Sequence, residues 1–494
     1  MLPNRILASL LSSLALVLSA CPPPDSPTPD AGVLPDVSGQ RAVLSMTSTG
    51  EVRIPVDLSA APPQALVLEG DTFVTYPGEG RADGTFTIPN VPAGTYYLRA
   101  EPNFFVVTDS RRLELSTELL GRPDAVTQPA DAGAAEVVFE LDNLHPYQAT
   151  DGITLFSLNA NVARFRLTPS IATAATSGSF TYTVRAGQPL VDPARGDRGL
   201  LTQLTSRTAT PEGTSETLPY RSVSRFLEAP EFQARPGERQ TLSGTLTEPP
   251  ALTASIHWDL ASYRNLASAV HPRATVVSEA MVFDVLPAPL SYSYRSLLPR
   301  LFELAQGPSV AQMHATFTYA NPYPASWNAV GVAAVRYAVP YQLPGTTSPV
   351  VLFGGASITD TLPSLLSKTI AFPYGPVLQP RIGGQDARQP VTLNTTTPEL
   401  SWTAPVSLPD MHYIVFVQEL SAQGSATVSR LVGTLLTDDT RLRLPPGLLS
   451  SGKSYVFTFD VNTTPGNDLL RQVFLRLPIP ITGVETLSEI VTVE

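Results

Sequence analysis

The chain has 494 residues and a net charge of −11, with 43% hydrophobic and 15% charged residues. It is too apolar for a disordered protein and long enough for about three or four domains. Its 32 basic residues are spread out, which argues against a nucleic-acid partner, because phosphate binding needs a clustered basic face. Its 49 prolines disfavour helices and favour strands joined by rigid turns, which predicts an all-β protein.

Residues 1–20 have the plan of a secretory signal: a charge at Arg5, an apolar stretch over 6–18, and two small residues. The apolar stretch is too short for a comfortable transmembrane helix. Leu18-Ser19-Ala20-Cys21 resembles the lipobox of bacterial lipoproteins, and Cys21 is the only cysteine in the sequence. The resemblance implies cleavage before Cys21 and lipid attachment to it. The alternative is an ordinary signal peptide with a cysteine nearby.

Residues 21–42 are rich in proline and show no apolar period, so we expect a semi-rigid tether. Pro22 stands where the lipoprotein family carries Asp for inner-membrane retention. The resemblance therefore favours the outer membrane of a Gram-negative bacterium. No later segment has 18 consecutive apolar residues, so we expect lipid to be the only membrane anchor.

The first folded domain is expected over residues 43–120. Alternating apolar residues at 52–58 predict a strand, and shorter strands are expected at 65–68 and 73–76. The stretch 83–98 resembles the hairpin signature of the carboxypeptidase regulatory-like (prealbumin-like) β-sandwich, and its matching residues are Asp83, Gly84, Phe86, Ile88, Val91, Gly94, Tyr96 and Leu98. The resemblance implies a spacer or carbohydrate-binding-like fold without peptidase activity.

Residues 121–137 are predicted to form a linker. Ranges 138–290 and 291–375 resemble no family, and we expect one large or two smaller β-sandwiches there. A polar stretch at 187–217 separates strands, and short helices are expected at 263–269 and 296–306. Strands are expected at 180–184, 242–246, 255–258, 281–285, 315–319, 330–339 and 350–353.

Residues 376–494 resemble a fibronectin type III domain, which is an Ig-like β-sandwich. Trp402 matches the inward Trp of strand B, and Tyr455, after the turn at 444–447, matches the tyrosine corner. The whole chain is therefore predicted to be all-β: several tandem β-sandwich (Ig-like/prealbumin-like) domains after a signal peptide and tether.

The sequence predicts no catalytic, cofactor or metal site. None of the five histidines has zinc-site spacing, and no nucleophile elbow or phosphate loop occurs. A Ser-His-Asp triad assembled from distant segments stays open. Residues 192–197 and Asp438-Asp439 are acidic enough to be candidate calcium ligands, but they lack the regular spacing of a calcium loop and are expected to be solvated loops. Arg195-Gly196-Asp197, an adhesion tripeptide, is expected to be a chance match.

Aromatic side chains on one sheet face can stack on sugars when they are exposed and coplanar, although packing in the core is the commoner role. The candidates are Tyr96, Tyr97, Phe104, Phe105, Tyr319, Tyr323, Trp327, Tyr337 and Tyr341.

The sequence thus favours a lipid-anchored cell-envelope protein acting as a non-enzymatic scaffold, adhesion or binding module. Its expected partners are the membrane, through lipid on Cys21, and another envelope protein or a polysaccharide. The alternative is an anchored hydrolase or carbohydrate-binding protein with its site in 138–375. A concave pocket that brings His257 or His314 together with carboxylates would favour the hydrolase.

Overall fold

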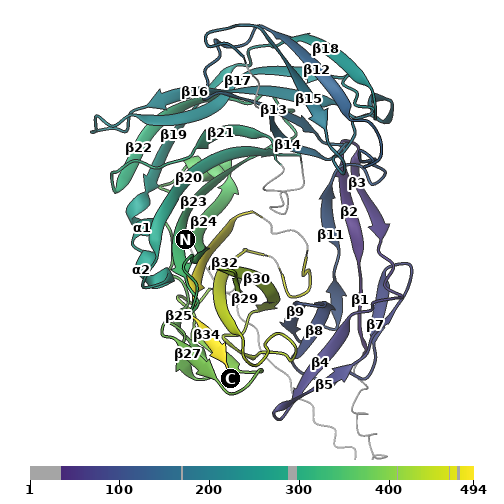
Figure 1. Ribbon diagram of the computed structural model, residues 1–494, viewed down its shortest axis with the longest axis vertical. Helices are drawn as coiled ribbons and strands as arrows, with labels where there is room; N and C mark the ends of the chain where they lie inside the picture. Colours follow the sequence, from purple (N-terminus) through teal and green to yellow (C-terminus); the bar gives the residue numbers. More distant parts are fainter. Residues whose placement is uncertain (1–34, 168–170, 288–297, 409, 467, 475–478) are drawn as a thin grey trace, which may run out of the picture. The chain divides into compact units, whose positions relative to one another are not determined.

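The structure is a computed structural model that describes residues 35–167, 171–287, 298–408, 410–466, 468–474 and 479–494 (Figure 1). The predicted signal peptide, the lipid site at Cys21 and the first part of the predicted tether lie outside the described residues. The described chain from Asp36 onward belongs to one compact unit.

The all-β prediction is confirmed. The described residues form 34 strands arranged in several sheets, and their only α-helices are three of four or five residues. These helices are α1 (Leu260–Arg264), α2 (Ala267–Val270) and α3 (Leu362–Leu366), and one 3-10 turn, η1, spans Pro193–Arg195. No helix among the described residues is long and apolar enough to span a membrane.

Two sheets near the N-terminus bury a shared core. One contains β1 (Val37–Gln40), β6 (Glu79–Gly80), β7 (Thr85–Ile88) and β10 (Arg112–Glu114). The other side is formed by β4 (Gln64–Glu69), β5 (Thr72–Tyr76), β8 (Tyr96–Glu101) and β9 (Phe104–Thr108). Phe86, Ile88, Tyr96 and Leu98 are all buried in this core.

The expected hairpin between β7 and β8 is not formed. β7 pairs with β1 and β6, whereas β8 pairs with β4 and β9. The segment between them contains Pro89 and Pro92, which lack the N–H groups that a continuous ladder needs. The chain therefore crosses from one sheet to the other, and both strands fill the same core.

Two predicted boundaries need correction. β1 lies inside the range 21–42 that was predicted as tether, and its Val37 is fully buried opposite Ile88. β12 (Ala135–Asp142) begins inside the predicted linker 121–137. The first residues of both segments are too few or too polar to show the alternation of apolar and polar residues that predicts a strand. They form strands because they pair with neighbouring strands.

A small sheet of β2 (Ala42–Thr47), β3 (Gly50–Pro55) and β11 (Thr117–Leu120) follows (Figure 1). A second small sheet contains β12, β15 (Gly178–Val184) and β18 (Arg239–Thr245). It shares a core with β13 (Gly152–Ser157), β14 (Val162–Leu167), β16 (Gly199–Ala209) and β17 (Leu218–Ala229), in which Phe139, Leu155 and Phe232 are buried.

The polar stretch predicted at 187–217 contains the eleven-residue strand β16, so that prediction is wrong. The polar side chains of β16 are buried because they find partners. Thr202 Oγ1 lies 2.5 Å from Thr154 Oγ1, and Gln203 Nε2 donates to the His145 carbonyl at 2.9 Å.

The middle of the chain continues with β19 (Ala251–Asp259), β20 (Thr275–Leu286), β21 (Arg300–Leu304), β22 (Gln312–Ala320), β23 (Asn328–Tyr341) and β24 (Val350–Thr361). The helix expected at 296–306 is wrong, because 300–304 form β21 between β17 and β20. Pro299 inside the expected helix cannot support its hydrogen bonds. The helix expected at 263–269 is present in part, as α1 and α2.

The last segment forms one sheet of β25 (Leu378–Ile382), β26 (Gln385–Asp386), β28 (Glu399–Thr403) and β31 (Arg441–Arg443). Trp402 of β28 packs edge-on against Tyr413 and Phe459. The remaining strands are β27 (Val391–Leu393), β29 (Met411–Gln423), β30 (Ala426–Thr437), β32 (Ser454–Thr463), β33 (Ile481–Leu487) and β34 (Val491–Val493).

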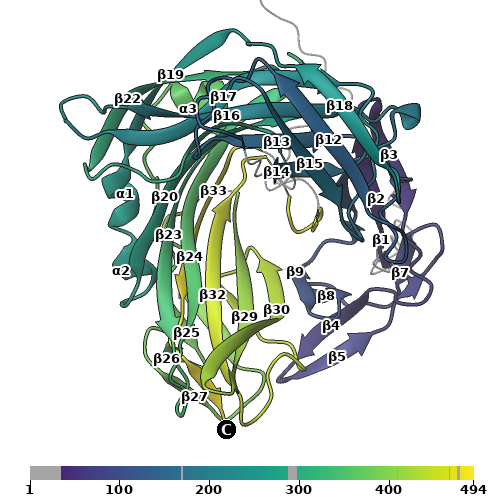
Figure 2. The same cartoon turned by 45° about the horizontal axis from the view of Figure 1, so that its top comes forward.

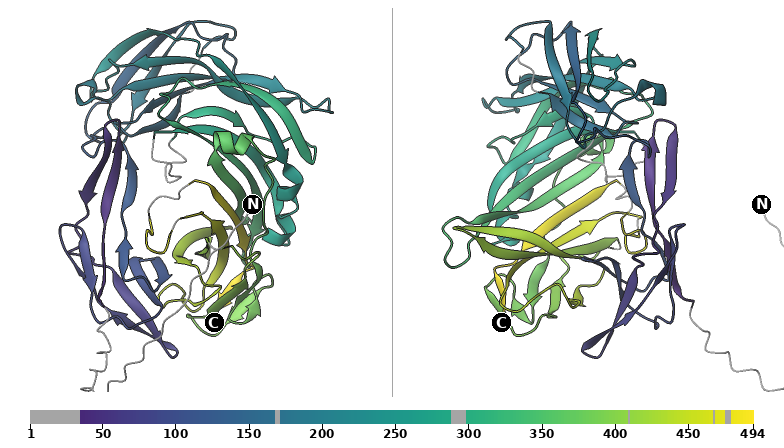
Figure 3. Two further views of the ribbon diagram at one scale, coloured as in Figure 1. Left: turned by 180° about the vertical axis from the view of Figure 1, so that it is seen from behind. Right: turned by 45° about the vertical axis from the view of Figure 1, so that its right-hand side comes forward.

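The largest sheet contains 18 strands, which come from all four expected folded ranges, 43–120, 138–290, 291–375 and 376–494. Successive pairs join β13, β16, β17, β21, β20, β23, β24, β33, β32, β29, β30, β9, β8 and β4. Figures 2 and 3 show the long central strands of this run side by side. The pair β30–β9 is parallel, and the other pairs in this run are antiparallel.

Candidate functional site

A cavity of about 600 Å³ lies where the loop between β22 and β23 meets β16, β17 and the ends of β2 and β13. We call it the Trp327 cavity. Aromatic and proline side chains form its apolar wall, and its polar wall carries Arg198, Glu228, Asn159 and Ser48. An apolar cavity with a few convergent polar groups is the usual form of a small-molecule site.

The apolar wall contains two aromatic rings that lie in nearly parallel planes, one stacked on the other. Tyr323 and Trp327 stack with centroids 5.6 Å apart and an angle of 8° between the rings. Phe226 meets the Tyr323 ring edge-on at 5.9 Å, and Phe156 meets Trp327 edge-on at 6.0 Å. Tyr323 is buried and Trp327 is half-buried, so the Tyr ring backs the more accessible Trp ring.

Local turns of the β22–β23 loop hold these rings in place. Asn321 Oδ1 accepts a hydrogen bond from the Tyr323 N–H at 3.1 Å, and the Trp327 N–H donates to the Pro324 carbonyl at 2.9 Å. Both are standard turn contacts, and proline fixes the backbone between them. Burial raises the pKa of Tyr323, with the nearby Thr202 acting in the opposite direction, so the phenol stays neutral.

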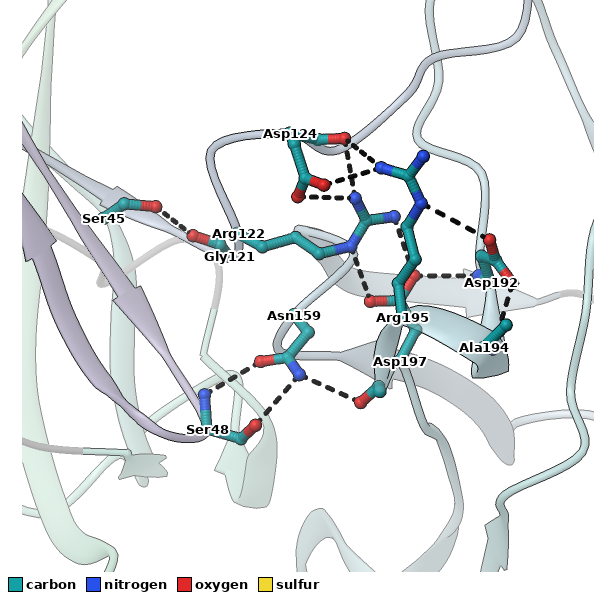
Figure 4. A network of polar contacts seen from close by, with 11 residues as sticks. Ser45, Ser48, Gly121, Arg122, Asp124, Asn159, Asp192, Ala194, Arg195 and Asp197 are labelled. Carbon is teal, nitrogen blue, oxygen red and sulfur yellow. Dashed lines mark hydrogen bonds and ion pairs between the residues drawn. The ribbon is translucent and has the colours of Figure 1, made fainter. Parts of the chain in front are cut away.

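The polar wall is partly accessible. Arg198 Nη1 lies 2.7 Å from Glu228 Oε1, and both side chains are largely exposed. Asn159 is fully engaged: its Oδ1 accepts from the Ser48 N–H at 2.8 Å, and its Nδ2 donates to Ser48 Oγ and to the Gly196 carbonyl at 2.9 Å each (Figure 4). Asn159 thus ties the turn after β2 to the loop at 192–198.

A buried ion pair fixes the loop at 192–198. Arg122 Nε and Nη2 donate to the two oxygens of Asp197 at 3.0 and 3.1 Å, and Asp197 is fully buried (Figure 4). Asp124 accepts from Arg122 Nη1 at 2.8 Å and from Arg195 Nη1 at 2.6 Å. Hydrogen bonds with Asp197 raise the pKa of Arg122, which stays charged. Such a two-pronged pair restrains both partners and so positions the neighbouring Arg198.

The acidic segment at 192–197 is therefore part of an arginine–carboxylate network. No group of three or more metal ligands occurs among the residues that the structure describes. The tripeptide Arg195-Gly196-Asp197 is not an exposed ligand, because Asp197 is buried. At the second acidic pair, burial raises the pKa of Asp438, and the neighbouring Asp439 adds to that rise.

His257 and His314 are cross-strand neighbours whose rings stack with centroids 3.6 Å apart. His314 Nδ1 lies 2.7 Å from Glu212 Oε2, and its Nε2 lies 3.4 Å from Ser255 Oγ. Neither imidazole lines the Trp327 cavity. The structure thus brings these histidines to one carboxylate, Glu212, which is exposed.

Most aromatic candidates pack in the core. Of the nine, Tyr323 and Trp327 line the Trp327 cavity. The core takes Tyr96, Tyr97, Phe105, Tyr319, Tyr337 and Tyr341, which are all buried. Phe226, Arg198 and Glu228 were missed, because each lies in or next to a strand with no distinctive local pattern.

No known protein family matches the sequence, and no curated protein shows significant similarity to it.

Proposed function

We propose that the protein is a lipid-anchored, non-enzymatic binding module of the bacterial cell envelope, and that the Trp327 cavity binds a saccharide. The observation that carries the saccharide proposal is the half-buried Trp327 ring, stacked in parallel on Tyr323 beside the Arg198–Glu228 pair. A sugar ring has one flat face of C–H groups, which packs on an aromatic ring, and a rim of hydroxyl groups, which needs hydrogen-bond partners. A saccharide site therefore needs both an apolar wall and a polar wall.

The chemistry of the cavity favours a neutral ligand. The half-buried indole of Trp327 supplies an apolar surface on which a sugar face can stack. Arg198 supplies donors and Glu228 supplies acceptors, which together match vicinal hydroxyl groups. Because the two charges are paired, the polar wall carries no net charge that would select a phosphate or another ion. The volume of about 600 Å³ suits a ligand of one or two sugar rings.

The test is a glycan array followed by titration calorimetry on the full chain. We expect wild type to bind at least one saccharide, and Trp327→Ala to weaken that binding by at least about tenfold through loss of the stacking surface. Phe353→Ala is the matched control: it removes an exposed aromatic ring from a different surface and should leave affinity unchanged.

Trp327 also packs on Phe156, so its removal can perturb the fold. Arg198→Gln provides a second variant, because Arg198 is largely exposed and bonds only at the polar wall. It should weaken binding without changing the melting temperature. A wild-type protein that binds no saccharide on the array, or a folded Trp327→Ala protein that binds as wild type does, would refute the proposal.

The anchoring proposal rests on the lipobox resemblance at Cys21 and the proline-rich segment after it. Several acyl chains, at about 0.8 kcal/mol per buried CH₂, hold a protein firmly on a bilayer. Cys21→Ala should abolish metabolic labelling with fatty acid and release the protein from the membrane fraction. Persistence of both label and membrane association in the variant would rule out lipid attachment at Cys21.

A further inference from the structure

A second cavity adjoins the Trp327 cavity at Glu228, which lines both. It lies between the end of β17 and one edge of β18, and its volume is about 230 Å³. We call it the Gln240 cavity. Ordinary small-molecule sites have roughly 300–1,000 Å³, a range that includes the Trp327 cavity but not this one. The Gln240 cavity is therefore too small for a separate ligand of that size, and it suits part of a ligand that also occupies its neighbour.

The Gln240 cavity lies where two strand edges separate. The Phe226 N–H donates to the Thr247 carbonyl at 2.9 Å, and the Thr247 N–H donates to the Phe226 carbonyl at 2.8 Å. After Phe226, β17 pairs only with β16 among the described strands, and β18 is an edge strand that pairs only with β12. The two edges that meet at Phe226 and Thr247 thus continue without pairing, and the cavity occupies the space between them.

The backbone of Glu228 places hydrogen-bonding groups at the junction of the two cavities. In an antiparallel pair, alternate residues direct their N–H and C=O groups to opposite sides. Because Phe226 bonds to Thr247 and not to β16, Glu228, two residues further on, also directs these groups away from β16. Its carboxylate adds an acceptor: Oε1 lies 2.7 Å from Arg198 Nη1, and Oε2 has no partner among the described residues. A ligand that passes between the cavities therefore meets one donor and two acceptors.

The lining of the Gln240 cavity combines an apolar wall with a polar rim. The wall contains Val137, Leu227 and Leu242, and the rim contains Glu231, Gln233 and Gln240. The side chains of Glu231 and Gln233 make no hydrogen bond with a described residue, and Gln240 makes one long bond, 3.5 Å from its Nε2 to Glu238 Oε2. An amide has donors and acceptors, which matches a hydroxyl group because the hydroxyl also donates and accepts. These groups are therefore available to the hydroxyls of a sugar ring.

The charge at the rim favours a neutral sugar. Glu231 is exposed, and no cationic side chain among the described residues pairs with it. A uronic acid in this cavity would bring a second carboxylate close to that of Glu231, and like charges repel. The Gln240 cavity thus has the same preference for uncharged saccharides as the Trp327 cavity.

We infer that the two cavities together bind an extended, neutral oligosaccharide, with one or two rings in the Trp327 cavity and the next ring in the Gln240 cavity. This inference rests on the proposed function, because it extends the same site. The observation that carries it is that Glu228 lines both cavities and offers hydrogen-bonding groups to a chain that crosses between them.

The test is titration calorimetry of the full chain with neutral malto-, cello-, xylo- and N-acetylchito-oligosaccharides of one to six rings. In a series that binds, affinity should rise by at least about tenfold from two rings to four and then level off, because the added rings reach further contacts on a ligand that is already held. A longer chain also has more ways to occupy a short site, but that effect grows only in proportion to the number of rings. An oligogalacturonate of four rings should bind more weakly than the neutral tetrasaccharide.

Two variants locate the gain in affinity. Gln240→Ala and Gln233→Ala should each remove most of the gain with chain length and leave the affinity for the disaccharide unchanged. Both side chains are partly exposed, so the melting temperature should be kept. The matched control is Gln389→Ala, which removes an exposed glutamine from the loop before β27 and should bind every length as wild type does. Trp327→Ala should instead weaken binding at every length.

The outcomes separate this inference from the proposed function. If no saccharide of any length binds, both fail. If disaccharides bind but affinity rises no further than in proportion to chain length, the extended chain is refuted and the Trp327 cavity remains a site for one or two rings. An equal tenfold gain in wild type, Gln240→Ala and Gln233→Ala would likewise refute binding in the Gln240 cavity alone.

Discussion

Arg122 restrains the loop at 192–198, beside the Trp327 cavity, through an ion pair with the buried carboxylate of Asp197. Buried and exposed ion pairs contribute differently to stability. The Arg122 partner Asp197 has no exposed side-chain surface, whereas the side chain of Asp124 is 63% exposed. Water screens the exposed pair and leaves it worth little, while a buried carboxylate that loses its only cation keeps the full cost of dehydration.

Arg122→Ala should therefore lower the free energy of unfolding by about 3–5 kcal/mol, since it leaves Asp197 buried and unpaired. Asp124→Ala removes an exposed partner of the same guanidinium and should cost less than about 1 kcal/mol. Urea unfolding followed by tryptophan fluorescence measures both. Equal losses in the two variants would mean that the buried pair is not what restrains the loop.

Asp460 gives a pH dependence with a defined sign. Its pKa in the folded protein is about 7, above the usual value of 3.8, so the folded state holds the proton more tightly than the unfolded state. Below about pH 4 the carboxyl is protonated in both the folded and the unfolded state, so its titration does not change the free energy of unfolding. Between about pH 4 and about pH 7 the free energy of unfolding falls, because the unfolded state gives up the proton first. Its direct cross-strand neighbours are Ile414 and Glu485, and burial is the main cause of the raised pKa.

Asp460→Asn should consequently be more stable than wild type at about pH 8, by up to a few kcal/mol at about 1.4 kcal/mol per pKa unit. The difference should disappear at about pH 4. Thermal unfolding of both proteins across this range measures it. A difference that is constant with pH would show that Asp460 does not titrate as the burial of its carboxyl requires.

At the scale of elements, the Tyr455 turn links a sequence motif to a tertiary contact. The Ser450 N–H donates to the Tyr455 hydroxyl at 2.8 Å, and the Tyr455 ring is buried. Tyr455→Phe keeps the ring and leaves that N–H without its acceptor, so it should cost about 1–3 kcal/mol. An unchanged denaturation midpoint for Tyr455→Phe would contradict this role.

Strand prediction succeeded where the pattern is local. Residues 180–184 and 315–319 alternate apolar and polar side chains, and both lie within strands, β15 and β22. It failed at β16, whose buried Thr202 and Gln203 look like loop residues until their partners on other strands are known. β21 failed for a related reason, because β17 and β20 on either side decide its conformation.

The candidate site was predictable only in part. Residue type alone put Tyr323 and Trp327 among the candidates, but not which of the nine aromatic rings would stay accessible. Phe226 and Glu228 come from β17 and meet the β22–β23 loop only in the folded chain. The row of residues that includes Asp460 and Glu485 had no sequence signal, because strand pairing assembles it from five strands.

At the scale of the whole molecule, the large sheet makes distant segments depend on one another. Strand β9 pairs in parallel with β30, so that Phe105 stands opposite Leu435. The Arg443 N–H donates to the Tyr97 hydroxyl at 2.9 Å, across 346 residues of sequence. Contacts of this separation carry no local pattern, which is why the sequence led us to expect domains in tandem without showing how their strands would join.

Removing residues 376–494 should therefore destabilise what precedes them. The truncation leaves β9 without β30 and β24 without β33, so two long sheet edges lose their partners. Unpaired edges of this kind expose rows of N–H and C=O groups and promote aggregation.

We expect the full chain to unfold in one main calorimetric transition, and the truncated chain to unfold at lower temperature and to form oligomers on size exclusion. If the truncated chain and the isolated 376–494 segment were both monomeric, with melting temperatures equal to two separate transitions of the full chain, the segments would be independent. The pairings β9–β30 and β24–β33 would then contribute little to stability. A much lower melting temperature in both fragments would instead show that these two strand pairings supply a substantial part of the stability of residues 36–494.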